Sequence, residues 1–482
     1  PKGMIYNPIY RFLAQLAALF LPLFLISQVS FNTSMVLPVG SACKKLAVGD
    51  LNDDGRKDVL IATQDVGAPG QDYKLNLFLS GQDGLETNPI IINYPNIFPG
   101  LSALSVGDID NDGLNDIVIG IQDQIGIFRQ NDDHTFGNAE MMYSGNSVDG
   151  ISIGDVDNDG LNDLAVSHWN EPSIKIFHQT ANGFITSSYP KPEGGRDQIH
   201  IGDMNGDGLN DVVVMIGQLQ ESGLHVFLQN QTGALQPYVT YQSPTPGIEG
   251  WMNGFAIGDL NGDGLNDLVA TQGGNEPDAR ISIWYQDPIS NNFQIGLLLQ
   301  AYQAPVSVEI ADLDCDGRNE IIVGHQGFGA ISVFEQGNGL FNGYNVFHFS
   351  ADGPSDNSGL GVADINGDDR KDVLTANWQF GLACSVNSTA PDIFDSLLTS
   401  VVVEVIGSGT VQDSWSYNLY EIDTIGDAVI GSLMSYSFVR TTQVDTIRTD
   451  TMLMRYGTIC GHDFADTIHQ ITITVLDSVL GV

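Results

Sequence analysis

Basic residues are scarce in this sequence: 18 Lys and Arg stand against 59 Asp and Glu, for a formal net charge of −41. A surface with this charge repels phosphate backbones and anionic lipids, which excludes nucleic acid as a partner. Hydrophobic residues nevertheless make up 42% of the chain and glycine is abundant, with 55 residues, which does not match a disordered acidic chain. The acidic groups therefore belong to a folded protein, and bound cations are the expected means of neutralising them.

An apolar run long enough to span a membrane is also missing. The run from Phe12 to Ile26 has 15 residues, short of the ~20 that a bilayer-spanning helix needs. Lys2 and Arg11 precede it and small polar residues follow, which predicts a signal peptide over residues 1–27. We expect a secreted or cell-surface protein that meets a membrane only if this segment stays uncleaved.

Cysteines and catalytic motifs are few. Four cysteines cannot build a disulfide-based fold, they form no CxxC pair, and their spacing leaves any pairing open, a Cys384–Cys460 bridge included. The sequence has no HExxH or P-loop motif. We therefore predict that the protein is not an enzyme.

Seven acidic nonamers recur along the chain, at spacings of 58, 47, 48, 56, 53 and 52 residues. They read DLNDDGRKD, DIDNDGLND, DVDNDGLND, DMNGDGLND, DLNGDGLND, DLDCDGRNE and DINGDDRKD. A period near 50 residues is typical of a β-propeller with one blade per repeat. Each nonamer lies between two strand-like runs, and a third run with an aromatic residue follows in most repeats, so one repeat has the four strands of a blade.

Positions 1, 3, 5 and 9 of every nonamer carry oxygen-bearing side chains, which are the ligands that Ca²⁺ requires. Up to seven structural Ca²⁺ ions are expected. The predicted ligands are Asp50, Asn52, Asp54 and Asp58; Asp108, Asp110, Asp112 and Asp116; Asp155, Asp157, Asp159 and Asp163; Asp203, Asn205, Asp207 and Asp211; Asp259, Asn261, Asp263 and Asp267; Asp312, Asp314, Asp316 and Glu320; Asp364, Asn366, Asp368 and Asp372.

Position 6 of the nonamer is Gly in six of the seven copies, which permits a sharp turn, and Asp369 replaces it in the last copy. An EF-hand is excluded because no copy has the acidic residue that such a loop needs at position 12. The succession of strand, DxDxDGxxD loop, strand and VFxQxxxGxF resembles the FG-GAP and VCBS repeat family, known from the propeller of integrin α subunits. The resemblance covers residues 40–383 and implies a calcium-binding propeller, although the FG and GAP strings are mostly missing.

The predicted fold class is all-β: a seven-bladed propeller over residues 28–383, then a smaller β-sandwich-like domain, similar to Ig-like or PKD-like modules, over residues 384–482. The seventh repeat lacks its VFxQ run. We expect residues 31–38 to supply the outer strand of that blade and residues 381–386 its third strand. Completion by residues 392–406 is the alternative.

The loops between second and third strands must lie on the ring face opposite the acidic loops. These loops and the connection into the fifth repeat supply the candidate ligand-binding residues His168, Trp169, Asn170, Glu171, Trp251, Asn275, Glu276, His325 and Trp378. Aromatic rings beside Asn, Glu and His suit an extracellular glycan or a protein ligand. In the alternative interpretation the tryptophans pack between blades.

The leading functional prediction is a non-catalytic adhesion or binding scaffold. A carbohydrate-active lyase or hydrolase using Glu171 or Glu276 is one alternative, and a purely structural spacer is the other.

Overall fold

The chain divides into two units, residues 1–390 and 391–482. The computed structural model describes, in the first unit, residues 29–32, 35–39, 41–64, 73–81, 84–94, 101–169, 171–194, 198–217, 222–244, 251–337, 340–341, 343–348, 359–377 and 381–389. In the second unit it describes the backbone of seven strands. The predicted signal peptide, residues 1–27, lies outside the described residues.

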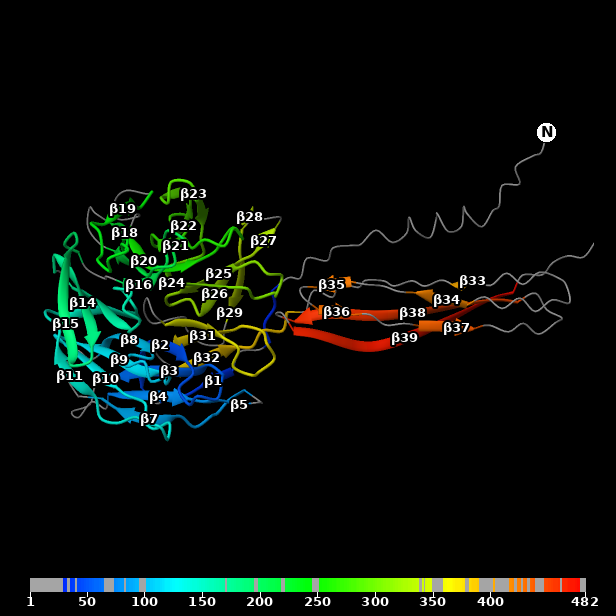
Figure 1. Ribbon diagram of the computed structural model, residues 1–482, viewed down its shortest axis with the longest axis horizontal. Helices are drawn as coiled ribbons and strands as arrows, with labels where there is room; N and C mark the ends of the chain where they lie inside the picture. Colours follow the sequence, from blue (N-terminus) through cyan, green and yellow to red (C-terminus); the bar gives the residue numbers. More distant parts are fainter. Residues whose placement is uncertain are drawn as a thin grey trace, which may run out of the picture. The chain divides into compact units, whose positions relative to one another are not determined.

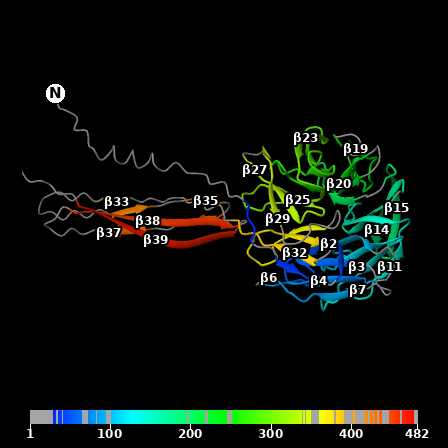
Figure 2. The same cartoon turned by 180° about the vertical axis from the view of Figure 1, so that it is seen from behind.

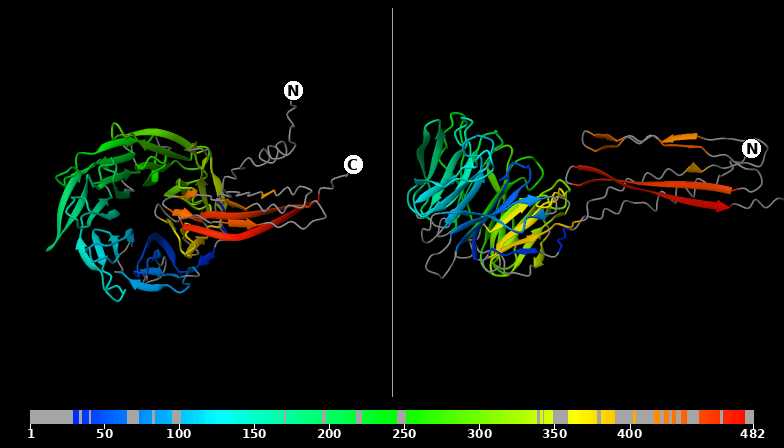
Figure 3. Two further views of the ribbon diagram at one scale, coloured as in Figure 1. Left: turned by 45° about the vertical axis from the view of Figure 1, so that its right-hand side comes forward. Right: turned by 90° about the horizontal axis from the view of Figure 1, so that it is seen from below.

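Seven four-stranded antiparallel sheets form the first unit and are arranged in a ring (Figure 3). From the first strand to the fourth they are blade 1, β2 (Ala42–Gly49), β3 (Asp58–Gln64), β4 (Lys74–Phe78) and β7 (Ile90–Asn93); blade 2, β8 (Leu101–Gly107), β9 (Asp116–Ile121), β10 (Gln124–Phe128) and β11 (Glu140–Tyr143); blade 3, β12 (Val148–Gly154), β13 (Asp163–His168), β14 (Ser173–Thr180) and β15 (Gly183–Pro190); blade 4, β16 (Gln198–Gly202), β17 (Asp211–Ile216), β18 (Gly223–Phe227) and β19 (Val239–Gln242); blade 5, β20 (Met252–Gly258), β21 (Asp267–Gln272), β22 (Arg280–Gln286) and β23 (Phe293–Gln300); blade 6, β24 (Pro305–Ala311), β25 (Glu320–His325), β26 (Ala330–Phe334) and β29 (Asn345–His348); blade 7, β30 (Leu360–Ala363), β31 (Asp372–Asn377), β32 (Gly381–Ser385) and β1 (Met35–Leu37).

Two short hairpins are added to this pattern, β5 (Ser80–Gly81) with β6 (Gly84–Leu85) and β27 (Gln336–Gly337) with β28 (Leu340–Phe341). The predicted seven-bladed propeller is confirmed.

Burial follows the position of a strand within its blade. The second strands are buried at every residue, as in β17, because a neighbouring blade covers each of their two faces. Fourth strands such as β11 and β15, at the rim of the ring, consist of exposed and half-buried residues (Figure 2). Seven apolar clusters result, one at each junction between neighbouring blades. The core is therefore distributed around the ring.

The small residue that ends each first strand makes room for the next blade. A Cβ atom on Gly49 would lie 2.4 Å from Val106 Cγ1, and one on Gly154 would lie 2.9 Å from Ile201 Cγ2. Val106 and Ile201 belong to the first strands of the following blades. The repeated glycine thus lets the inner strands pack closely.

Strands from both ends of the repeat region close the ring. Strand β1 pairs antiparallel with β32, with Met35 opposite Cys384 and Leu37 opposite Leu382 (Figure 1). The contact continues where Ser388 N donates to Ser30 O (2.9 Å) and Ser30 N to Thr389 Oγ1 (3.0 Å). The predicted closure by residues 31–38 and 381–386 is confirmed, and β32 carries blade 7 to Ser385, two residues past the predicted boundary at 383.

Cys384 is a buried free thiol, so the suggested Cys384–Cys460 disulfide is wrong. Strand β32 places the cysteine inside blade 7, where it packs in the apolar cluster at the junction of blades 7 and 1. Burial raises the pKa of the thiol to about 12, which keeps it protonated and unreactive.

Every element described in the second unit is a β-strand: β33 (Val402–Val403), β34 (Ser416–Leu419), β35 (Asp423–Ile425), β36 (Ala428–Ile430), β37 (Met434–Ser437), β38 (Thr446–Ile459) and β39 (His462–Leu476). Strands β38 and β39 form a long hairpin, and β33 adds a third strand to it. The β-rich prediction is confirmed, whereas the sandwich architecture stays a prediction. Within the described residues of both units, no helix is long and apolar enough to cross a membrane.

Candidate metal centres and the opposite face

Each acidic nonamer forms the turn between the first and second strands of its blade. Its fourth and sixth residues both have a left-handed backbone, as in Asn111 (φ 59°) and Gly113 (φ 93°). Asp369, which replaces glycine in the seventh loop, has φ 66° and adopts the same conformation. Asp and Asn tolerate this region better than most residues. All seven loops therefore have the same backbone turn.

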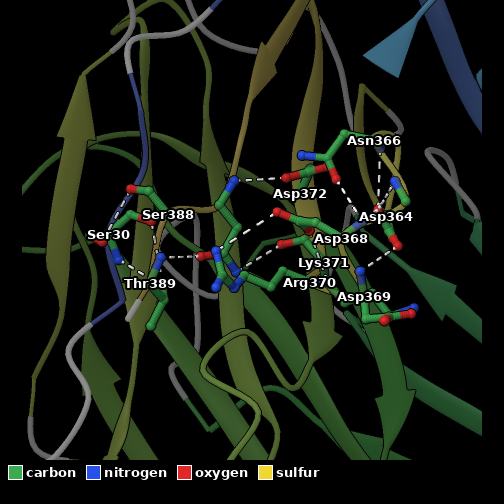
Figure 4. Close-up of polar contacts among 12 residues, drawn as sticks. Ser30, Asp364, Asn366, Asp368, Asp369, Arg370, Lys371, Asp372, Ser388 and Thr389 are labelled. Atoms are coloured by element: carbon green, nitrogen blue, oxygen red, sulfur yellow. Dashed lines mark hydrogen bonds and ion pairs between the residues drawn. The ribbon is translucent and has the colours of Figure 1, made fainter. Parts of the chain in front are cut away.

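The acid at position 1 organises the loop from inside. In loop 7 the amide of Asp369 donates to Asp364 Oδ2 (2.8 Å), and that of Asp368 donates to Asp364 Oδ1 (3.3 Å) (Figure 4). In loop 4 the amides of Gly208 (2.8 Å) and Asp207 (3.2 Å) make the same bonds to Asp203. The turn thus directs both oxygens of position 1 toward the loop interior.

The acid at position 9 begins the second strand and is buried. In loop 5 Asp267 Oδ2 accepts from Leu260 N (2.8 Å) and Oδ1 from Gln286 N (2.9 Å). Blades 1 to 4 and 7 repeat both bonds, and in loop 6 Glu320 Oε2 accepts from Leu313 N (2.8 Å). Position 9 therefore ties together the loop, the second strand and the third strand.

Burial raises the pKa of the position 9 acid in loops 1, 2, 4, 5, 6 and 7 and so makes it difficult to ionise. Burial and, to a smaller extent, the negative charges of Asp207 and Asp203 raise the pKa of Asp211 to about 7, although two backbone N–H groups oppose the shift. Burial is also the main reason why the pKa of Glu320 rises to about 9. The negative charges of Asp314, Asp312 and Asp316 contribute to this shift. A cation inside the loop would favour the ionised carboxylates and so offset the free-energy cost of burying their charge.

The side chains present fit a hard divalent cation. Carboxylate oxygens of Asp108, Asp110 and Asp116 lie within 4.8 Å of one another, as do those of Asp155, Asp157 and Asp159 and those of Asp312, Asp314 and Asp316. Asp110 Oδ1 and Asp157 Oδ1 are buried with no hydrogen-bond partner. A bound Ca²⁺ would satisfy such orphaned oxygens, because it takes six to eight oxygen ligands. The donor sets of loops 3 and 6 are thus consistent with the calcium sites predicted from the sequence, whereas in loop 2 Arg129 Nη1 already lies 2.5 Å from Asp110 Oδ2.

Amide side chains join each loop to the preceding one. The residue at position 8 donates to the position 1 carbonyl of the previous loop, as in Asn266 Nδ2 to Asp203 O (2.9 Å). The same bond links blades 2, 3, 4 and 6 to their predecessors. Blade 7 uses Asn387 instead, whose Nδ2 donates to Leu313 O (2.7 Å). The Asn of the DGLND string is therefore a link between blades, a role that the sequence analysis missed.

The junction of blades 7 and 1 differs from these. Lys57 and Ser80 stand where blades 2 to 6 have amide side chains, whereas blade 7 has Lys371 but keeps an amide at Asn387. Ser80 Oγ donates within its own blade, to Lys57 O (2.5 Å). Packing of residues such as Leu46, Ile61 and Leu374 holds this junction instead.

The structure places two of the candidate ligand-binding residues, His168 and His325, in the core of the opposite face. Both are buried at the ends of second strands. His325 Nδ1 lies 2.7 Å from Gln303 O and Nε2 lies 2.8 Å from Ser332 Oγ. Burial lowers the pKa of each imidazole to about 4. They are neutral structural residues that a ligand at the surface does not reach.

Other candidates do lie at the surface. Trp169 is 44% exposed and Trp251 is 38% exposed, and Asn275 and Glu276 are exposed. Trp169 and Trp251 therefore do not pack between blades, whereas Trp284 on β22 does so in the apolar cluster at the junction of blades 4 and 5. Asn170 and Trp378 lie outside the described residues.

Glu171 belongs to a polar cluster beside Trp169. Its Oε1 accepts from Asn146 N (2.7 Å), and Lys175 Nζ lies 3.6 Å from Oε2. Burial would raise the pKa of Glu171, but these partners hold it below its usual value. Ser144 Oγ lies 2.8 Å from His168 Nε2, yet both residues are buried and Glu171 Oε2 is 4.0 Å from His168 Nδ1. This arrangement anchors the loop and does not present a nucleophile.

A second aromatic group, the Tyr302 patch (Tyr302, Phe328 and His348), lies at the same face of blades 5 and 6. The ring of Tyr302 is 6.0 Å from that of Phe328 and 6.1 Å from that of His348. Phe328 is 41% exposed. Glu276 connects with this region, because its N–H donates to Gln303 Oε1 (3.2 Å) and its Oε1 accepts from Tyr344 OH (2.7 Å). Sequence reasoning missed Tyr302, although connections between blades reach the same face.

The comparison with protein families agrees with this geometry. The model of the FG-GAP-like repeat matches residues 50–119, 108–166, 155–214, 203–270, 259–323 and 312–375, which together span more than half of the chain. The chain belongs to the FG-GAP-like repeat family. Each matched segment runs from one acidic loop through the strand after the next loop, so the family's repeat coincides with the loops described above.

No curated protein matches the chain in sequence. Among solved structures, an Agrocybe aegerita lectin that recognises non-reducing terminal N-acetylglucosamine is similar, with 17% identity, a TM-score of 0.45, and coverage of 64% of this chain and 81% of the lectin. The WD40 domain of Toxoplasma gondii coronin is 9% identical, with a TM-score of 0.47, and the match covers 76% of this chain and 89% of that domain.

Proposed function

We propose that this FG-GAP propeller is a secreted or cell-surface scaffold that binds structural Ca²⁺ on one face and a glycan or protein ligand on the other, without catalysis. The observation that carries the proposal is the sevenfold acidic loop, whose inward oxygens and buried, hard-to-ionise position 9 acids call for a cation. Extracellular calcium is abundant enough to fill modest sites. The net charge of −41 favours such a location, because seven ions would reduce it only to −27.

The ligand is proposed to bind the face away from the loops. Trp169 and Trp251 expose large rings there, and Glu276 is an exposed hydrogen-bonding group of the same face. Rigid aromatic rings give contact area at little entropic cost and can stack on the apolar face of a sugar. In this proposal the metal ions stabilise the ring, and the side chains on the face away from the acidic loops determine which ligand binds.

Retention of the full chain on immobilised polysaccharides and on intact cell surfaces tests this proposal. Trp169→Ala and Trp251→Ala should each reduce retention at least tenfold while leaving the melting temperature within about 2 °C, because both side chains are exposed. Ile289→Ala is the matched control, since Ile289 is 93% exposed in the β22–β23 connection on the calcium-loop face. Equal retention of all variants would contradict a ligand on the proposed face, and no retention of the wild type would favour a structural spacer.

A further inference from the structure

One position in each blade faces the acidic loop from the third strand. It is the residue immediately before the one whose backbone N–H donates to the position 9 acid, as Arg129 precedes Gln130 in blade 2. In blades 1 to 7 the position holds Leu79, Arg129, His178, Leu228, Tyr285, Glu335 and Val386. The seven copies share one backbone frame, but their loops also differ at position 7, which is Leu in loops 2 to 5 and Arg in loops 1, 6 and 7. Each of these Arg side chains pairs with the position 5 acid of its own loop, as Arg56 does with Asp54 (2.8 Å).

The residue at this position varies together with position 3 of the loop. Position 3 is Asn in blades 1, 4, 5 and 7, where the facing residue carries no charge. It is Asp in blades 2 and 3, where the facing residue is Arg129 or His178. In blade 6 Asp314 occurs with Glu335, which is engaged elsewhere, accepting from Val29 N (3.2 Å) and Asn345 Nδ2 (3.1 Å). A basic side chain thus accompanies the additional acid in blades 2 and 3.

In blade 2 the guanidinium of Arg129 lies against the predicted calcium ligands. Its Nη1 is 2.5 Å from Asp110 Oδ2 and 3.9 Å from Asp116 Oδ2. These two acids and Asp108 form the cluster within 4.8 Å described above. On its other side, Arg129 Nε lies 3.6 Å from Glu140 Oε2 on β11, which holds the side chain in place.

The charge of Arg129 is permanent. A guanidinium stays protonated in proteins whatever its surroundings. A dication bound to Asp110 and Asp116 would therefore meet a fixed positive charge within a few ångströms and would have to displace it. Loops 4 and 5 have no such charge, because Leu228 and Tyr285 occupy this position and Leu occupies position 7. The position 7 Arg side chains of loops 1, 6 and 7 pair with the position 5 acid, whereas Arg129 lies against the acids at positions 3 and 9.

We infer that Arg129 is the resident cation of loop 2 and that this loop takes no Ca²⁺. The inference rests on the proposed function, because it presumes that the other loops bind calcium. It is confined to loop 2: His178 makes similar contacts with Asp157 (3.1 Å) and Asp163 (3.3 Å), but a neutral imidazole can itself be a metal ligand. Six ions per chain are expected in place of the seven predicted from the sequence.

Counting bound Ca²⁺ per chain by equilibrium dialysis and elemental analysis tests the inference on the full chain. Asp112→Asn removes a position 5 acid from loop 2 and should leave the count unchanged, whereas the matched Asp207→Asn in loop 4 should lower it by one. Arg129→Met keeps an unbranched side chain without charge and should raise the count by one. Combining Arg129→Met with Asp112→Asn should return the count to the wild-type value.

A transplant into blade 4 gives a test that does not depend on the folding of Arg129→Met. Asn205→Asp with Leu228→Arg should lose one Ca²⁺, while Asn205→Asp alone should lose none. A loss of one ion from Asp112→Asn in the wild-type background, or an unchanged count in Arg129→Met, would overturn the inference and leave the calcium scaffold intact. A wild-type chain with no bound calcium would overturn both this inference and the proposed calcium scaffold.

Discussion

On one face of the ring the chain makes the same nine-residue turn seven times, whereas the connections on the other face differ in length and sequence from blade to blade. Every loop repeats the two left-handed residues and the inward bonds of position 1. The opposite face has Trp169 and an acid in blade 3 but an aromatic patch around Tyr302 in blades 5 and 6. The comparison shows that the turn on which the structure of every blade depends is repeated, whereas the exposed side chains that could contact a ligand vary from blade to blade.

The largest effect of a single substitution is expected at position 9 of a loop. Asp267→Ala removes a buried acceptor and leaves the amides of Leu260 and Gln286 without partners. At ~1–3 kcal/mol for each unsatisfied group, the loss in the free energy of unfolding should be about 2–6 kcal/mol. Urea unfolding at a fixed calcium concentration measures it.

Asp263→Ala in the same loop is the control, because Asp263 is an exposed position 5 acid. Both substitutions remove one predicted calcium ligand, so only the buried hydrogen bonds distinguish them. If the two variants lost equal stability, position 9 would have no structural role beyond metal binding.

A smaller effect is expected from the buried histidine His325 on the opposite face. Its pKa is about 4 in the folded chain against 6.5 for the unperturbed group, so between these values the unfolded chain binds more protons. Acidification from pH 6.5 to pH 5 should therefore destabilise the wild type more than His325→Gln, by at most about 1.4 kcal/mol per pH unit. Parallel stability profiles of the two proteins would show that His325 is not buried as a neutral group.

The smallest effect is expected at a link between blades. Asn266→Ala removes the bond from Asn266 Nδ2 to Asp203 O and should cost ~1 kcal/mol. Lys57→Ala, at the same loop position in blade 1, should change stability by less than about 0.5 kcal/mol, because no amide stands there. Similar melting temperatures for Asn266→Ala and Lys57→Ala would argue against these links.

Repetition made most of the ring predictable. The spacing of the nonamers indicated seven blades, and the missing VFxQ run in the seventh repeat indicated that an N-terminal strand completes it, as β1 does. The turn also proved robust to the exchange of Gly for Asp369, whose backbone has the same left-handed conformation. These features follow from local sequence, because each is a property of one strand or one turn.

The remaining features depend on contacts between blades. His168 and His325 end second strands, which neighbouring blades cover on both faces, and the sequence does not show that this burial extends to the last residue. Neither the link from Asn266 to blade 4 nor the approach of Arg129 to loop 2 follows from spacing, because their partners lie on other strands. The C-terminal unit lacks a repeat, so its composition predicted strands but not their arrangement.

Thermal unfolding of the full chain with Ca²⁺ and with excess chelator tests the central claim most directly. A site occupied at 100 times its Kd contributes about 2.7 kcal/mol, so six sites would contribute roughly 16 kcal/mol, as much as the whole stability of a typical domain. The account predicts that chelation lowers the melting temperature by tens of degrees or unfolds the ring. An identical melt in both conditions, with no metal bound, would contradict it.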